Sequence, residues 1–171
     1  VKRVEAVFDL LNGAKGCAAS HIKALESVPN GSSVMVLEDD CFFTAKPSKL
    51  KEQFDSFLRH FQNNWDVFLL GGNYIKKACS SNPFFYQIHK SFLTHSYIVN
   101  SHYISTLKQC FEKSHQSMSH ALEKLHLNLR VNIDTVWHEL QRKDRWYAGK
   151  EKVTHQTESF SDIYAELVQK G

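Results

Sequence analysis

The order of hydrophobic and polar residues divides the chain into strand-like and helix-like segments. Apolar runs at 34–37 and 66–70 have the length and composition of strands buried on both faces. Between them, a stripe of large apolar residues at helical spacing after Pro47 predicts a helix: Leu50, Phe54, Phe57, Leu58 and Phe61. Strands that alternate with helices indicate an α/β fold with a mainly parallel sheet flanked by helices.

Weaker patterns complete the expected order of elements. We expect further helices at 16–28, 101–113, 117–125 and 134–141, and a closing helix capped by Ser161. Strand-like segments lie at 4–10, 84–89, 94–100, 129–131 and 145–148, whereas 76–83 and 154–160 have the character of loops. With 171 residues, 42% of them hydrophobic, the chain 1–171 can form one domain with its own core.

Composition and charge argue against several classes of protein. The net charge of +3, from 21 basic and 18 acidic residues without a basic stripe, does not predict nucleic-acid binding. No apolar run reaches the ~18 residues of a membrane span and no signal peptide is visible, so we expect a soluble protein, intracellular or peripheral to a membrane. The four cysteines contain no Cys-x-x-Cys pair, so no zinc site is expected. The mixed α/β pattern favours free thiols, although a bridge stays open.

The strongest candidate for a site is the acidic run Glu38-Asp39-Asp40, directly after the apolar run at 34–37. Carboxylates are costly inside a strand but tolerable at its exit, where ligands of open α/β sheets bind. Three adjacent carboxylates need a counter-charge, and an oxygen-binding cation such as Mg²⁺ or Mn²⁺ would supply it. The alternative is a polar strand end followed by a turn.

A series of short motifs follows in order along residues 4–163: Gly16-Cys17-Ala18-Ala19-Ser20-His21, Leu37-Glu38-Asp39-Asp40, Trp65-Asp66 through Gly71, Thr94-His95-Ser96-Tyr97, Asp134 at a helix start, and Gln156 followed by Ser161-Asp162-Ile163. Together they resemble glycosyltransferase family 25, which includes bacterial lipooligosaccharide galactosyltransferases and collagen galactosyltransferases. Members usually begin with a strand that carries asparagine-leucine and then arginine. No such pattern precedes Val4, so this first strand is either missing from the chain or built differently.

The resemblance implies a GT-A-like, single Rossmann-like domain. It implies an inverting hexosyltransferase that uses a nucleotide-sugar, expected to be a UDP-sugar, with Mn²⁺ or Mg²⁺ at a DxD-type motif. The acceptor would be an oligosaccharide or a glycoprotein. Two other readings stay open: a metal-dependent phosphodiesterase, which also needs carboxylates at strand ends, and a non-catalytic carbohydrate-binding domain.

The resemblance and the chemistry together suggest roles for individual acidic residues and histidines. Asp40 would bind the metal, Glu38 would share it or hold the donor ribose, and Asp39 would face sugar hydroxyls. His155 is a candidate third metal ligand or a solvent-exposed loop histidine. Asp134 is the expected general base, although its position also suits a helix N-cap. His138, four residues on, is a second base or a surface histidine.

The remaining candidates would contact the donor. The start of the helix at 16–28 offers free N–H groups to an anion, and Lys15 adds charge. Gly16, Ser20 and His21 would line the same place, although Ser20 and His21 could instead make polar contacts between helix and sheet. Gly71 and Gly72 could bring the backbone close to the sugar or form a tight turn. Thr94 and His95 are further candidates of this kind.

Overall fold

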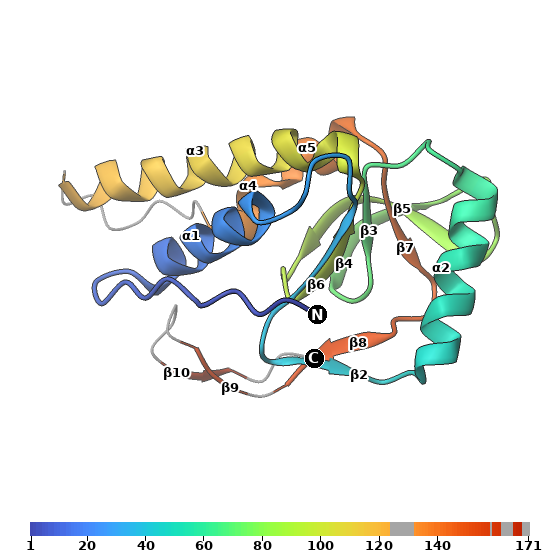
Figure 1. Cartoon of the computed structure of the whole chain (residues 1–171), viewed down its shortest axis with the longest axis horizontal. Helices are drawn as coiled ribbons and strands as arrows, with labels where there is room; N and C mark the ends of the chain where they lie inside the picture. Colours follow the sequence, from blue (N-terminus) through green and yellow to red (C-terminus); the bar gives the residue numbers. More distant parts are fainter. Residues whose placement is uncertain (124–131, 158, 162–165, 169–171) are drawn as a thin grey trace.

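The computed structural model describes residues 1–123, 132–157, 159–161 and 166–168 (Figure 1). Its helices are α1 (Gly13–Glu26), α2 (Pro47–Phe61), the 3-10 helix η1 (Ser101–Tyr103), α3 (Ile104–Glu123), α4 (Ile133–Val136) and α5 (His138–Lys143). Its strands are β1 (Val34–Leu37), β2 (Cys41–Phe43), β3 (Val67–Leu69), β4 (Asn73–Cys79), β5 (Phe85–Phe92), β6 (Ser96–Val99), β7 (Trp146–Gly149), β8 (Thr154–Gln156), β9 (Ser159–Ser161) and β10 (Glu166–Val168).

The central sheet has six strands in the order β1-β6-β3-β7-β5-β4. Strands β3 and β7 run parallel, whereas β1–β6, β3–β6, β5–β7 and β4–β5 are antiparallel pairs. The α/β class is therefore confirmed, but the prediction of a mainly parallel sheet is wrong. Alternating strand and helix patterns do not fix strand direction, and here β4, β5 and β6 follow one another without an intervening helix.

Two hydrophobic clusters cover the two faces of this sheet. Val67 and Leu69 of β3 pack with apolar residues of α1 and α3 on one face. Phe68, between them in the sequence, packs with the aromatic stripe of α2 on the other face, as expected from the alternation of side chains along a strand. Figure 1 shows α1 and α3 side by side, with α2 apart from them. The predicted helix after Pro47 and the buried strand around Val67 are thus confirmed.

Strand β1 differs from the prediction because it lies at the edge of the sheet. It pairs with β6 along one side, and Met35 and Leu37 are each 41% exposed, so the strand is not buried on both faces. An apolar run cannot by itself distinguish an edge strand from a central one.

The segment at 4–10, expected as a strand, has no regular structure and runs beside α1 (Figure 1). The Val7 N–H donates to Ser20 Oγ at 2.8 Å, and Lys23 Nζ donates to the Glu5 carbonyl at 2.9 Å. A Cβ on Gly16 would lie 2.7 Å from the Val7 carbonyl oxygen, so this close approach needs glycine. Because its backbone bonds go to α1, the segment is not paired in the sheet.

Several other expected boundaries also change. The first half of 76–83 belongs to β4, whose polar residues are tolerated because β4 is the opposite edge strand. Helix α3 runs unbroken through the expected gap at 114–116, and 154–160 contributes to β8 and β9 rather than a loop. The prediction of a closing helix after Ser161 is wrong, because Leu167 lies on strand β10, which pairs antiparallel with β9. The expected strand at 129–131 lies outside the described residues.

All four cysteines are free thiols, as the mixed α/β pattern favours. Within the described part of the chain, no helix combines the length and apolar character needed to cross a bilayer.

Candidate functional site

One end of the central sheet gathers several of the residues singled out in the sequence. Strands β1, β3 and β7 point the same way, and β6 runs against them. The carboxyl ends of these three strands therefore lie at the end of the sheet where β6 begins, which we call the site edge. Glu38 leaves β1 there, and its N–H donates to the His95 carbonyl at 2.9 Å. Thr94 Oγ1 donates to Glu38 Oε1 at 2.6 Å. The acidic run and the Thr94-His95 motif therefore meet, as expected for a site at strand ends.

The side chain of Glu38 points toward α1, where it contacts a buried histidine. His21 Nε2 lies 3.2 Å from Glu38 Oε1, and its Nδ1 lies 2.8 Å from Tyr97 Oη. Burial lowers the pKa of His21, but the surrounding Tyr97, Cys17 and Glu38 side chains raise it well above its usual value. Burial likewise raises the pKa of Glu38, and the His21 and Thr94 contacts outweigh it, so that the carboxyl pKa is lowered. These pKa directions favour an imidazolium and a carboxylate, held between α1 and β1.

The predicted donor contacts Lys15, Gly16 and Ser20 lie on α1, and the chain's own N-terminal segment lies against them. Ser20 Oγ accepts the Val7 N–H and donates to the Gly16 carbonyl at 2.8 Å. Lys15 Nζ is 3.6 Å from Asp9 Oδ2. Asn12 caps the helix, since its side chain accepts the Lys15 N–H at 3.1 Å. The structure brings these three residues to the N-terminal segment, and their contact with a donor stays a prediction.

Beyond Glu38 the chain turns into β2, which pairs with β8 near the end of the described chain. Asp39 is exposed, and Asp40 Oδ2 accepts the Gln156 Nε2–H at 2.7 Å. His155 is exposed and stands opposite Phe42 in the β2–β8 register. Asp40 directly precedes β2 and His155 lies on β8, so the pairing of these two strands brings the two residues into the same region, as a shared site would need.

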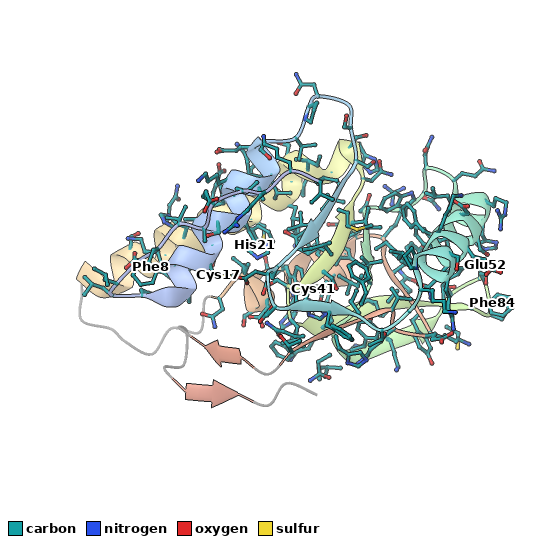
Figure 2. The ribbon with its side chains drawn as sticks, turned by 60° about the horizontal axis from the view of Figure 1, so that its bottom comes forward. Phe8, Cys17, His21, Cys41, Glu52 and Phe84 are labelled. Atoms are coloured by element: carbon teal, nitrogen blue, oxygen red, sulfur yellow. The ribbon has the colours of Figure 1, made fainter. Side chains whose placement is uncertain are left out.

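The three predicted metal ligands Asp40, Glu38 and His155 do not converge as one set, because Glu38 points to α1. Among the described residues, the set of three metal-ligating side chains that does converge is Cys17, His21 and Glu38, with ligand atoms all within 4.8 Å of one another. Figure 2 labels Cys17 and His21 on the side of α1 that faces the sheet. The sequence carried a signal for this set, since Cys17 and His21 have the i, i+4 spacing of one helix face.

Gly71 and Gly72 follow β3 at the same edge, and both positions require glycine. A Cβ on Gly71 would collide with the Thr154 side chain and would lie 2.5 Å from the Thr154 carbonyl oxygen and 2.7 Å from His95 Nε2. Gly72 has φ = +145°, a region that other residues rarely adopt. These facts fit the tight-turn interpretation, and a contact with the donor sugar stays a prediction.

Asp134 reaches the edge from α4. Its Oδ2 lies 3.5 Å from the N–H of Leu93, the residue before Thr94. Asn132, not Asp134, occupies the N-cap of α4, so the capping alternative is wrong. Burial raises the pKa of Asp134, and the negative charge of Glu38 adds to this effect. The site therefore contains two carboxyl groups with opposite shifts: the pKa of Glu38 is lowered and that of Asp134 is raised.

His138 is buried rather than a surface residue, which corrects one of its two interpretations. Its Nε2 lies 2.9 Å from the Ser91 carbonyl oxygen and must be protonated to donate to it. Burial lowers the pKa of His138, so the neutral ring is favoured.

Comparison with known proteins adds one finding. A family model described as glycosyltransferase family 25 (LPS biosynthesis protein) matches residues 3–136. The matched part contains the acidic run, the Thr94 motif and Asp134, and it ends before β7 and β8. No curated protein gives a significant match.

Proposed function

Because the chain belongs to glycosyltransferase family 25, we propose that it moves a hexose from a nucleotide-sugar, with a UDP-sugar as the expected donor, to a glycan or glycoprotein acceptor. The observation that best supports this is the single sheet edge where Glu38, Thr94 and Asp134 gather beside the two glycines after β3. Ligands of α/β proteins bind at such edges. The family description makes lipopolysaccharide-type glycans the first acceptors to test.

Asp134 serves as the general base in this proposal. Its carboxylate takes the proton of the acceptor hydroxyl while the hydroxyl oxygen bonds to the anomeric carbon of the donor. The bond from that carbon to the diphosphate breaks, and its electron pair leaves with the phosphate oxygen, so one displacement inverts the configuration. Because burial raises the pKa of Asp134, its carboxylate is a stronger base than an exposed aspartate.

The acidic run fits a hard divalent cation by the chemistry of its donors, since carboxylate oxygens suit Mn²⁺ and Mg²⁺. Asp40 would hold the cation, with the exposed Asp39 on the same turn and His155 on the strand paired with β2. The bond from Gln156 fixes the orientation of the Asp40 carboxylate. When bound, the cation would neutralise negative charge on the leaving diphosphate. Glu38 would contribute through the donor ribose or by sharing the cation after turning away from His21.

The test is a calorimetric titration of UDP into the protein, first with Mn²⁺ and then with EDTA. We expect binding that requires the metal and is lost in Asp40→Ala. Asp55→Ala is the matched control, because Asp55 lies on α2 and pairs with Lys51, away from the sheet edge. UDP binding that survives both EDTA and Asp40→Ala would contradict the metal site. Hydrolysis of a simple phosphodiester without UDP binding would favour the phosphodiesterase alternative.

A further inference from the structure

We propose that Cys17, His21 and Glu38 form a second cation site, selective for a thiophilic ion such as Zn²⁺, and that an ion bound there holds Glu38 away from the acidic run. The binding part stands on the geometry of these residues alone. The effect on sugar transfer rests on the proposed function. The i, i+4 spacing of Cys17 and His21 indicates two of these ligands in the sequence, but the third, Glu38, comes from another element.

The ligand atoms already lie close to a usable arrangement. Cys17 and His21 leave the same face of α1 one turn apart, and Glu38 faces them from the end of β1. Their ligand atoms are all within 4.8 Å of one another, and His21 Nε2 is 3.2 Å from Glu38 Oε1. Ligands around a tetrahedral zinc ion, bonded at about 2.0–2.3 Å, are roughly 3–4 Å apart. Small side-chain adjustments therefore suffice to close the site around an ion.

The groups that usually support metal ligands are also in place. A metal-bound histidine normally uses its other ring nitrogen in a hydrogen bond, and bound carboxylates are themselves hydrogen-bonded. Here Tyr97 Oη lies 2.8 Å from His21 Nδ1, which leaves Nε2 directed toward Glu38. Thr94 Oγ1 supports the Glu38 carboxylate at 2.6 Å. The Tyr97 side chain is fully buried, whereas that of Glu38 is 23% exposed and gives an ion access from solvent.

The chemistry of the ligands separates this site from the acidic run. Thiolate and imidazole ligands favour zinc, whereas Mg²⁺ and Mn²⁺ prefer carboxylate oxygens. Binding forms a bond from sulfur and one from His21 Nε2 to the cation, and the thiol proton and the Nε2 proton leave to solvent. The positive charge of the ion replaces that of the imidazolium beside Glu38. Three protein ligands leave a fourth position for water.

The probe is Co²⁺, which takes zinc sites and shows a sulfur-to-cobalt charge-transfer band when a thiolate binds it. We expect the band to saturate at one equivalent in the wild type and to disappear when Zn²⁺ is added. Cys17→Ser should lack the band. Cys110→Ser is the matched control, since Cys110 is also a half-buried helical thiol but lies outside the cluster, and it should keep the band. Tyr97→Phe should keep the band with about 10- to 100-fold weaker affinity, because only the supporting hydroxyl is lost.

A wild-type protein without the band, or a band that persists in Cys17→Ser, would overturn the proposed site. With Mn²⁺ saturating, Zn²⁺ should inhibit transfer in the wild type and much less in Cys17→Ser, each measured against its own zinc-free rate. Equal inhibition of both proteins would refute the effect on Glu38. If the band behaves as expected but no sugar transfer or UDP binding is found, the proposed function fails and the cation site stands.

Discussion

The carboxyl end of β3 is so tightly packed that Gly71→Ala tests how the site is held together. The added Cβ would lie 2.5 Å from the Thr154 carbonyl oxygen and 2.7 Å from His95 Nε2. Real Cβ atoms essentially never approach other atoms closer than 3.0 Å, so the Thr154 backbone must move by at least about 0.5 Å. Thr154 belongs to β8 and is fully buried, and backbone cannot rotate away as the end of a flexible side chain can.

The cost can be assembled from its parts. Overpacking of a buried site costs about 1–3 kcal/mol. Displacing Thr154 also weakens the buried bond between its Oγ1 and Ser96 Oγ, 2.6 Å long, worth about 1 kcal/mol. Replacing glycine stiffens the unfolded chain and returns about 0.4–1 kcal/mol. The net loss in the free energy of unfolding is about 2 kcal/mol, or roughly 4–8 °C in Tm for a chain of this length.

Gly149→Ala is the matched control, because Gly149 also ends a strand at this edge and is also buried. The three atoms nearest to its Cβ all belong to the end of the Gln53 side chain, which can move at the expense of one bond to the Glu151 carbonyl. We expect urea and thermal unfolding to place this variant within about 0.5 kcal/mol of the wild type. If both variants unfold alike, close packing is not the reason for glycine at position 71. UDP titration of the folded Gly71→Ala protein should also show weaker binding.

Other predictions concern acid–base chemistry, stability and the metal. Asp134→Asn should lower kcat about 10²- to 10⁴-fold without lowering Tm. It should also remove the acidic limb of kcat/KM, where the wild type loses its base as the pH falls through the raised pKa of Asp134. Asp66→Asn should cost about 2–3 kcal/mol in urea unfolding at pH 7, because Asp66 accepts bonds from Arg145 and pairs with His102. The Asp66 pKa is lowered on folding, so this difference should hold above its ordinary pKa and vanish as the pH falls through the lowered one, as pH-dependent unfolding would show. EDTA should abolish transfer and Mn²⁺ restore it in the wild type, whereas Asp40→Asn should stay inactive, as initial rates would show.

Local patterns predicted those parts of the fold that depend on one segment. The apolar stripe on α2 and the run around Phe68 fixed a helix and a buried strand, since burial of one face dictates the spacing of apolar residues. The acidic run was correctly expected at the end of a strand. It could be found because carboxylates after an apolar strand are compatible with only a few positions in a fold.

Features that depend on partners far apart in the chain could not be predicted in this way. Nothing in the run at 34–37 shows that β1 is an edge strand, since that depends on which strand pairs with β6. The orientation of Glu38 toward His21 is decided by α1 packing on the sheet. The direction of β7 beside β3 is likewise set by the path of the chain through α3 to α5, not by residues 146–149 themselves.

Strand β7 joins the two parts of the central sheet, since β3 lies on one side of it and β5 on the other. Until Trp146 and the residues after it leave the ribosome, the nascent chain can form only β1-β6-β3 and the separate β4–β5 hairpin, each with an open edge. Such edges are templates for pairing with other chains, and exposed intermediates of this kind aggregate. The core around this sheet is therefore complete only once β7 has been synthesised, and a chain that stops before residue 146 should depend on chaperones to remain unaggregated.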